Sequence, residues 1–505
     1  MDLSALPESW AAVTLEAVAE VHDNLREPVN STERKGRAGP FPYYGATGQV
    51  GWIDDFRQDG EYVLLGEDGA PFFDPTKDKA YLVYGKCWVN NHAHVLKARE
   101  GVCLNRYLLY ALNQVNYRGF ANGTTRLKLT QAAMRQLPIN LAPLAEQHRI
   151  VAKIEELFSE LDQGVASLKT AREQLKVYRQ SLLKNAFEGK LTAAWRAAHA
   201  DQLETATALQ QRIARERQAR YQQQLADWEA GGKQGSKPKA PKPLSPLTAE
   251  ELAELPELPA GWGWVRLETI QAFEKHAVKA GPFGSALKKE FYVAEGFKIY
   301  GQEQVIRGDY RYGDYFITES KFVELSSCTV RPFDVLISLV GTIGKVLVLP
   351  EHAAPGIINP RLVKISLNRG AYLPAFFKAY FESGFLRSLY ATESQGTTMD
   401  ILNLGMIQGL PYPLCSLEEQ QEILFELESK LSEADQLDQS LATALQQADA
   451  LRQSILKKAF SGQLVKQDKN EEPATALLER IRAARAASPA KGRQAKLVSK
   501  SLTNC

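Results

Sequence analysis

The chain has 505 residues, long enough for several domains that each bury a core of their own. Its net charge of +2 says little about what the protein binds. No apolar run approaches the ~20 residues that a membrane span requires. The five cysteines are scattered without C-x-x-C spacing, which argues against a disulfide framework or a structural zinc site. Because the N-terminus also lacks a signal-peptide pattern, we expect a cytoplasmic protein.

The first segment, residues 1–136, has the pattern of a mixed α+β module. Short apolar runs at 63–65 and 80–84 are bounded by glycine, proline and aspartate and predict strands. Residues 107–113 predict a short helix. This segment is called the first module below.

A long amphipathic helix is predicted within residues 137–192. From Leu144 onward, apolar residues recur at alternating three- and four-residue steps for more than five heptads, with polar exceptions such as Arg172. At 1.5 Å per residue the helix would be roughly 60–65 Å long, whereas helices of globular proteins average only ~11–12 residues. The pattern therefore predicts a helix that packs along its length against another helix.

The remainder of the chain repeats this order after a linker. Residues 193–257 form a polar helical stretch and a linker rich in Gly, Lys and Pro. Residues 258–409, the second module, contain strands predicted at 335–340 and 345–349 and a helix at 374–383. A second long helix is predicted within 410–465, and 466–505 predict a helix with a basic tail.

The two long-helix segments are copies of each other. They align without a gap at an offset of 273 residues, and 26 of 56 positions are identical. A tandem duplication implies two similar modules related by an approximate two-fold axis. Helices related in this way run antiparallel, so we predict two mixed α/β modules separated by an antiparallel coiled coil. Further repeated pairs are Pro7–Trp10 with Pro259–Trp262, Gly123-Thr124-Thr125 with Gly396-Thr397-Thr398, and 204–220 with 472–488.

The segments between the repeated blocks have diverged. Residues 16–122 and 268–395 show almost no likeness, and the second stretch is 21 residues longer. A shared frame that holds two different inserts indicates one architecture carrying two different recognition surfaces.

In their order, these motifs resemble the specificity subunit of Type I restriction–modification systems. Each half opens with Leu-Pro-x-x-Trp, closes its variable stretch with Gly-Thr-Thr, and continues with Leu-Pro, Leu-x-Glu-Gln and a long helix ending in Ala-Phe-x-Gly-x-Leu. The likeness covers essentially the whole chain. The first module also resembles a recurring subtype of target recognition domain through the motifs at 43–48, 66–70 and 88–94.

The resemblance implies that each module is a target recognition domain that reads one half of a split site in double-stranded DNA. The helices would space the modules and bind methyltransferase (M) subunits, with restriction (R) subunits completing the complex. S-adenosylmethionine, ATP and Mg²⁺ are then expected on the partner subunits and none of them on this chain. The residues expected in the coiled coil and in subunit docking are Leu144, Ile154, Phe158, Leu161, Leu417, Leu427, Leu431 and Leu441.

Base readout requires side chains with hydrogen-bond donors and acceptors on loops of a firm scaffold. Four segments meet this description: a basic loop followed by two tyrosines, a run of amide and imidazole groups, and two loops of the second module. Turn chemistry is an equally good account of each, because Asn and Gly form turns whatever they touch. The candidate DNA-binding residues are Arg34, Lys35, Arg37, Tyr43, Tyr44, Asn90, Asn91, His92, Ser285, Lys288, Lys289, Asn359 and Arg361.

Motifs for other chemistry are weak. His92 and His94 have no carboxylate or cysteine at metal-ligand spacing, and Gly341–Lys345 lacks the spacing of a phosphate loop. No methyltransferase motif, glycine-rich cofactor loop or convincing nuclease motif is present, so we expect a non-catalytic subunit without a metal. Two alternatives stay open at this point: a free-standing DNA methyltransferase or nuclease, and a coiled-coil scaffold with two protein-binding modules and no role on DNA.

Overall fold

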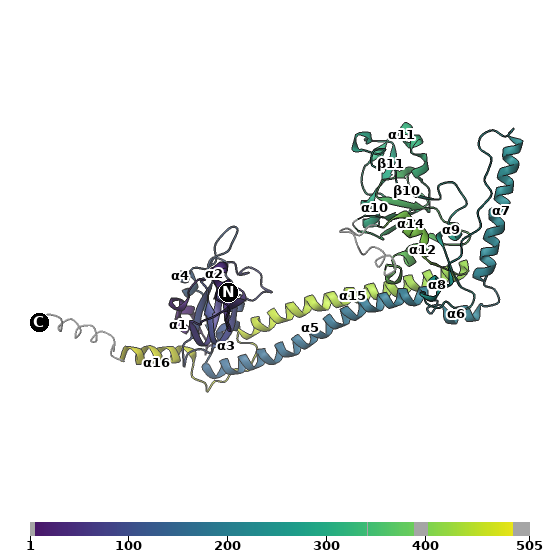
Figure 1. Ribbon diagram of the computed structural model, residues 1–505. Coiled ribbons are helices and arrows are strands. Elements are labelled where there is room, and N and C mark those ends of the chain that lie inside the picture. The colour runs from purple at the N-terminus through teal and green to yellow at the C-terminus, as the bar shows by residue number, and fades with distance from the viewer. Residues whose placement is uncertain (1–5, 341, 388–401, 488–505) are drawn as a thin grey trace. The chain divides into compact units, whose positions relative to one another are not determined.

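The computed structural model describes residues 6–340, 342–387 and 402–487, and it divides into two compact units. Unit 1 comprises residues 1–171 and 440–505, and unit 2 comprises residues 172–439. Each unit therefore contains one module and a part of each long helix (Figure 1). The Gly396-Thr397-Thr398 motif lies outside the described residues.

The first module is built on a six-stranded mixed sheet in the order β2-β7-β5-β6-β3-β4. Its strands are antiparallel neighbours except β3 and β6, which run parallel. The predicted strands at 63–65 and 80–84 lie inside β5 and β6, and the predicted helix at 107–113 is α3. The elements are β1 (Ala11–Thr14), α1 (Leu15–Val18), β2 (Ala19–Val21), η2 (Asp23–Leu25), α2 (Ser31–Lys35), β3 (Phe41–Gly45), β4 (Gly48–Ile53), β5 (Gln58–Gly66), β6 (Ala80–Val89), β7 (Ala93–Ala98), α3 (Asn105–Gln114), α4 (Gln131–Arg135) and β8 (Pro138–Leu141).

The second module has a different architecture. Two four-stranded sheets, β10-β17-β14-β15 and β12-β11-β16-β13, bury separate apolar clusters, and α12 covers the first of them. The predicted strands correspond to β14 and β15, and the predicted helix to α12. The elements are α8 (Ala249–Ala253), β9 (Gly263–Val265), α9 (Leu267–Ile270), β10 (Val278–Ala280), η3 (Lys289–Phe291), β11 (Phe297–Tyr300), α10 (Gln302–Arg307), β12 (Phe316–Ile317), α11 (Glu319–Glu324), η4 (Ser326–Cys328), β13 (Thr329–Val330), β14 (Val335–Ser338), β15 (Val346–Val348), β16 (Gly356–Ile358), β17 (Leu362–Ile365), α12 (Pro374–Phe381), α14 (Leu404–Gly409) and β18 (Tyr412–Leu414).

The long helices α5 (Leu144–Phe187) and α15 (Leu417–Ala459) run antiparallel, as predicted. In unit 1, Arg452 of α15 binds Asp162 of α5 and lies over the ring of Phe158. In unit 2, Arg172 Nε of α5 lies 2.8 Å from Asp438 Oδ1 of α15. The residue numbers of the contacts rise along α5 while they fall along α15, so the two helices are antiparallel. The seam residues Ile154, Leu175, Leu182, Leu427, Ala434, Leu441, Ala448 and Ile455 are buried.

Each long helix begins later than its repeated segment does. The first residues of both segments form strands, β8 and β18, which pair antiparallel with β1 and β9 at the opening of each module. Proline lacks a backbone donor and disfavours a helical residue before it, so Leu-Pro at the start of each segment fits a short strand better than a helix.

The segments after the long helices form shorter helices. They are α6 (Ala193–Ala198) and α7 (Ala206–Ala230) in unit 2, and α16 (Ala474–Ala487) in unit 1. The start of α7 is buried in the core of the second module, and the start of α16 in that of the first. Phe187, the last residue of α5, is buried in the core of the second module. Phe460, just after the end of α15, is buried in the core of the first module. No helix among the described residues is long and apolar enough to cross a membrane.

Candidate nucleic-acid interface

The repeated glutamates join the opening of each module to its long helix. The carboxylate of Glu146 accepts a hydrogen bond from Trp10 Nε1 at 3.0 Å, and that of Glu419 accepts one from Trp262 Nε1 at 2.7 Å. Both glutamates are buried. Burial raises the pKa of Glu146, while hydrogen bonds from Trp10 and Gln467 partly offset this effect. The duplicated Trp and Glu are therefore one contact made twice.

The glutamine that follows each glutamate performs a second repeated task. Gln147 Oε1 accepts from the Leu104 backbone N–H at 3.1 Å, just before α3, and its amide donates to the carbonyls of Val102 and Ala142. Gln420 makes the same three kinds of bond at the start of α12, including one from the Leu373 N–H at 2.9 Å. The frame thus supports each module at one helix N-terminus, where backbone donors lack intrahelical partners.

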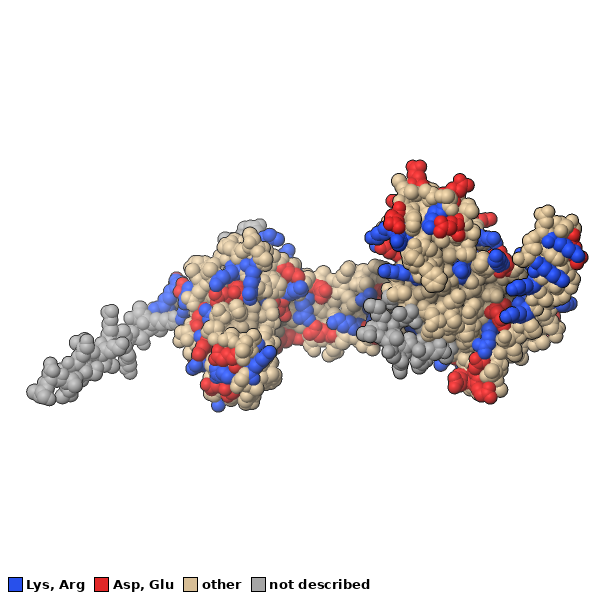
Figure 2. Space-filling view, turned by 45° about the horizontal axis from the view of Figure 1, so that its top comes forward, with Lys and Arg blue, Asp and Glu red and all other residues tan. Residues whose placement is uncertain are grey.

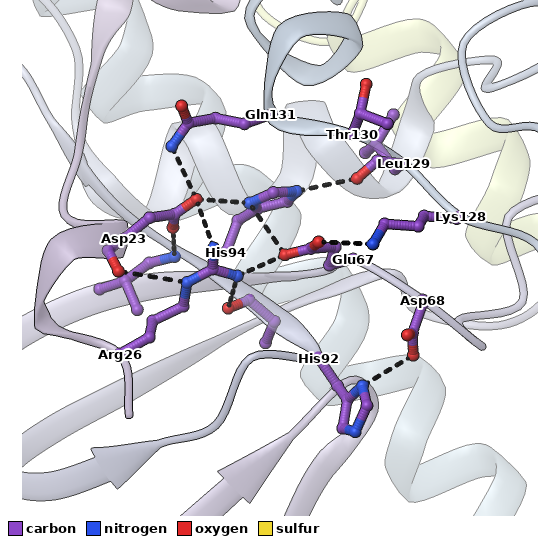
Figure 3. A network of polar contacts seen from close by, with 12 residues as sticks. Asp23, Arg26, Glu67, Asp68, His92, His94, Lys128, Leu129, Thr130 and Gln131 are labelled. Atoms are coloured by element: carbon purple, nitrogen blue, oxygen red, sulfur yellow. Dashed lines mark hydrogen bonds and ion pairs between the residues drawn. The ribbon is translucent and has the colours of Figure 1, made fainter. Parts of the chain in front are cut away.

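A buried polar network connects η2, β5 and β7 of the first module (Figure 3). His94, fully buried on β7, has Nδ1 2.7 Å from Asp23 Oδ2 and Nε2 2.9 Å from the carbonyl of Leu129. Arg26 binds both Asp23 and Glu67. Burial tends to raise the pKa of the carboxyl groups of Asp23 and Glu67, but His94 and the other donors outweigh it, and both pKa values are lowered. These residues act as a structural anchor that joins η2, β5 and β7.

The anchor fixes a basic strip, residues 123–128, on the surface. Glu67 accepts an ion pair from Lys128 Nζ at 3.3 Å, and its backbone carbonyl accepts from the Leu129 N–H at 2.6 Å. Asp68 pairs with Arg126 and with His92. The Arg126 and Lys128 side chains remain 59% and 55% exposed. Gly123-Thr124-Thr125 was recognised only as a repeated motif, and its basic neighbours Arg126 and Lys128 were missed. Their alternation with Leu127 and Leu129 is the signal in the sequence for an exposed basic strip.

The segment 34–37, predicted as a basic loop, is partly helical, because Arg34 and Lys35 belong to α2. Asn30 caps α2 by accepting from the N–H groups of Thr32 and Glu33, and this cap orders the segment. Arg37 pairs with Asp54 at 2.8 Å and lies over the Trp88 ring, while Lys35 is exposed.

The two tyrosines after this segment differ in exposure. Tyr43 is buried, and its hydroxyl group donates to the carbonyl of Val29 and accepts from its N–H. In this arrangement its ring cannot stack on a base, which corrects its place among the exposed candidates: it points to the core face of β3. Tyr44 is half-buried against Tyr81, and Arg34 lies over the Tyr43 ring at 4.7 Å.

The 90–92 segment is a turn between β6 and β7. Asn90 is buried, and its Oδ1 accepts from the His92 N–H at 2.8 Å, a bond that forms the turn. Asn91 is exposed and His92 is half-buried beside Asp68. Asn90 therefore has a structural role, whereas the side chains of Asn91 and, in part, His92 reach solvent.

The two candidate loops of the second module lie side by side. A side chain at Gly281 would lie 1.9 Å from the Asn359 carbonyl oxygen, so glycine permits the close approach. The Gly281 N–H also donates to the carbonyl of Leu362, just after Arg361. Asn359 forms a turn by accepting from the Arg361 N–H. The candidates Ser285, Lys288, Lys289 and Arg361 are exposed, and Asn359 is half-buried.

Phe283, at the tip of the first of these loops, was missed by the sequence analysis. Its side chain is 88% exposed beside an ordered turn in which the Ala286 N–H donates to the Phe283 carbonyl. Pro-Phe-Gly between two strands is the signal for a presented aromatic side chain, and apolar side chains can contact the thymine methyl group in DNA.

Metal ligands do not gather in the described part of the chain, where no group of three or more His, Cys, Asp or Glu could hold an ion. The four cysteines described there, Cys87, Cys103, Cys328 and Cys415, are buried and free. Burial raises the pKa of Cys87 to about 11, so its thiol is not a ready nucleophile.

Comparison with known proteins gives the same result as the repeated motifs. Residues 7–169 match the model of the Type I restriction modification DNA specificity domain. This segment is similar to that domain family. It contains the first module, its Trp10–Glu146 contact and the first part of α5.

Curated relatives are specificity subunits of type I restriction enzymes. A putative one from Haemophilus influenzae is 36% identical over 143 residues, which cover 28% of this chain and 36% of that protein. The EcoBI specificity subunit of Escherichia coli is 34% identical over 170 residues, or 32% of this chain and 36% of that protein. These two matches thus span about a third of each relative. The EcoKI specificity subunit of E. coli is 24% identical over 71% of this chain and 66% of its own length.

The fold also has a solved counterpart. A chain of a type I restriction–modification system, 18% identical, superposes with a TM-score of 0.56 over 91% of this chain and 99% of the other. The resemblance to specificity subunits and the predicted fold are confirmed. No finding tests the assignment of individual DNA-binding or docking residues, which stay predictions.

Proposed function

We propose that this chain is the DNA sequence-recognition subunit of a Type I restriction–modification complex. Each module reads one half of a bipartite target, and the paired long helices space the modules and dock the methyltransferase subunits. One observation carries the proposal: the same Trp–Glu and Gln contacts support two modules with different sheets. Two modules that differ while their supporting contacts are the same fit a protein that recognises two different sequences in one DNA molecule.

The proposal gives the chain binding and scaffolding roles and leaves chemistry to its partners. Methyltransferase and restriction subunits would supply methyl transfer and DNA cleavage, with S-adenosylmethionine, ATP and Mg²⁺ bound to them. Specific recognition would then combine phosphate contacts, which position the protein, with base contacts, which select the sequence.

A module exchange tests this proposal. The contacts of Glu67 and Asp68 with residues 126–129 cross the predicted border at 122, so a graft ending there would break them. The strand pairs β1–β8 and β9–β18 are better borders. Residues 15–137 are therefore replaced by the equivalent segment of a relative of known target, in the assembled complex. Mapping of methylated adenines should show one new half-site and one unchanged.

The matched control replaces residues 266–410 in the same way and should alter the other half-site. If either exchange changes both half-sites while the protein remains folded, independent reading by the two modules is wrong. If neither exchange changes the methylated sequence, the DNA-recognition role itself is wrong.

A further inference from the structure

The segment after the first long helix carries an excess of positive charge. Residues 206–246, which comprise α7 and the linker after it, contain eight Lys and Arg against three Asp and Glu, a net charge of +5 in a chain whose total is +2. The buried residues of α7, Ala206, Leu209 and Ile213, all lie in its first turns. Figure 2 shows basic side chains along the helix beyond this base.

The charges line a hollow between α7, the returning linker and the second module. The hollow has a volume of about 530 Å³. Arg217 and Arg220 reach it from α7, Lys239 from the linker and Lys275 from the second module. The one acidic residue in its lining, Glu274, is already paired with Arg331. Cations from three separate chain segments thus converge on one space.

Arg217 is the most informative of these cations. Its Nη1 atom is buried and has no hydrogen-bond partner in the described part of the chain, although the guanidinium lies 5.6 Å from the centre of the Phe273 ring. A buried charged donor without a partner is costly, and an anion in the hollow would satisfy it.

The neighbouring histidine indicates a positive local potential. The pKa of His276 is lowered, first by burial and then by Lys275, Lys279 and Lys364. The contribution of the three lysines reflects a positive potential beside the hollow, which favours an anionic ligand.

We propose that this hollow binds phosphate groups of duplex DNA in a sequence-independent manner. A phosphate group presents oxygens in several directions and suits cations that come from different chain segments. This inference rests on the proposed DNA-recognition role and adds a contact outside base readout.

The test removes two cations from the hollow and compares the result with a matched removal beside it. The hollow variant is Arg220→Ala with Lys239→Ala. The control is Arg215→Ala with Lys237→Ala, which also removes one arginine from α7 and one lysine from the linker, but neither residue lines the hollow. Both are prepared as full chains assembled with methyltransferase subunits. Binding to 30-base-pair duplexes with and without the target is measured across a salt series.

The hollow variant should bind both duplexes more weakly by the same factor, at least about fivefold at ~100 mM salt. Its salt dependence should fall by about one phosphate contact per removed cation. The control should change binding less than about twofold, and the methylated sequence should be the same for all three proteins. Equal effects in the hollow variant and the control would overturn the site, because diffuse charge alone would then explain binding. Unchanged DNA binding in the hollow variant would overturn it as well.

Competition identifies the source of the phosphate. Inorganic phosphate and a nucleoside triphosphate at millimolar concentration should bind the hollow weakly. Tight binding of either, lost in the hollow variant while DNA binding persists, would overturn the proposal in favour of a small-anion site. Loss of methyltransferase association instead of DNA affinity would overturn it in favour of an acidic protein partner. Failure of the unmodified complex to prefer any sequence would refute the proposed function itself, a result distinct from each of these.

Discussion

Burial and hydrogen bonding have opposite effects on the pKa of the Asp23 carboxyl group. It accepts bonds from His94 Nδ1 at 2.7 Å, the Val95 N–H at 2.9 Å and Gln131 Nε2 at 2.9 Å, and it pairs with Arg26. Burial alone would raise its pKa, but these donors produce a net lowering from the ordinary value of 3.8. The ionised form is therefore the one that stabilises the first module.

We predict that Asp23→Asn lowers the free energy of unfolding of the first module by about 2–4 kcal/mol near pH 7, because several donors lose a charged acceptor in a buried site. A folded-state pKa below the unfolded one gives stability that is present above the unfolded pKa and lost as pH falls through the folded value. The stability gap between the two proteins should consequently narrow below about pH 4.

Thermal and denaturant unfolding across pH check this prediction. Asp54→Asn is the control, because its ion pair with Arg37 is exposed and should contribute no more than about 1 kcal/mol. A pH-independent gap for Asp23→Asn would contradict the assigned role of the charge.

Single residues show where sequence reasoning stops. The duplication identified Glu146 and Glu419 as equivalent, but their tryptophan partners lie 136 and 157 residues away, and such contacts follow from the fold. Asn90 was predicted as either a DNA contact or a turn residue, and it forms the turn. Tyr43 was predicted as a DNA-binding candidate because it follows a basic segment, and no strand was predicted there. It lies in β3, which turns this side chain into the core.

At the level of elements, each long helix ends in a turn that requires glycine. Gly189 and Gly462 have φ angles of +68° and +74°. A Cβ atom at Gly189 would lie 2.4 Å from Pro259 Cγ, and one at Gly462 would lie 2.3 Å from Pro7 Cγ. The turn after each long helix therefore packs against the opening proline of the module in the same unit, which accounts for both repeated motifs together.

Gly189→Ala and Gly462→Ala should each destabilise their unit by about 1–3 kcal/mol, since alanine is strained at positive φ and its methyl group meets proline. Gly164→Ala is a matched control: this glycine lies inside α5 with nothing within 4 Å of the added Cβ, and the change should stabilise by about 0.5–1 kcal/mol. Denaturant unfolding measures all three. An unchanged free energy of unfolding for both turn variants would show that the turns rearrange to accommodate the added methyl group.

The heptad pattern predicted the existence and phase of the helix pair, because a seam maintained over many turns leaves few other arrangements. The tandem duplication predicted its antiparallel orientation. The strands β8 and β18 at the start of each repeated segment were missed. Each is short, and its assignment depends on a partner strand more than 100 residues away, β1 or β9. The β1 and β9 strands follow directly after the repeated tryptophan motif. The duplication therefore identified both segments of each strand pair as repeated, but it did not predict that they pair as strands.

At the scale of the whole molecule, the antiparallel register decides how the helix pair can be shortened. Asp162 pairs with Arg452 and Arg179 with Asp435, so residues 165–171 of α5 lie opposite residues 441–447 of α15. A repeat-based choice at the offset of 273 would remove 438–444 instead, and with it the Asp438 partner of Arg172. Deletion of the facing heptads keeps the flanking pairs matched.

We predict that a chain lacking both 165–171 and 441–447 folds and shortens the helix pair by roughly 10 Å while nearly preserving helical phase. If the pair spaces two DNA-reading modules, this corresponds to about three base pairs of rise and a third of a turn around the duplex. The complex should then methylate half-sites with a shorter spacer, or lose specific binding if the rotation is not absorbed. Deletion of one heptad alone should mispair the seam and lower thermal stability. Methylome mapping distinguishes these outcomes, and a folded double deletion that keeps the original spacer would show that the helices do not set it.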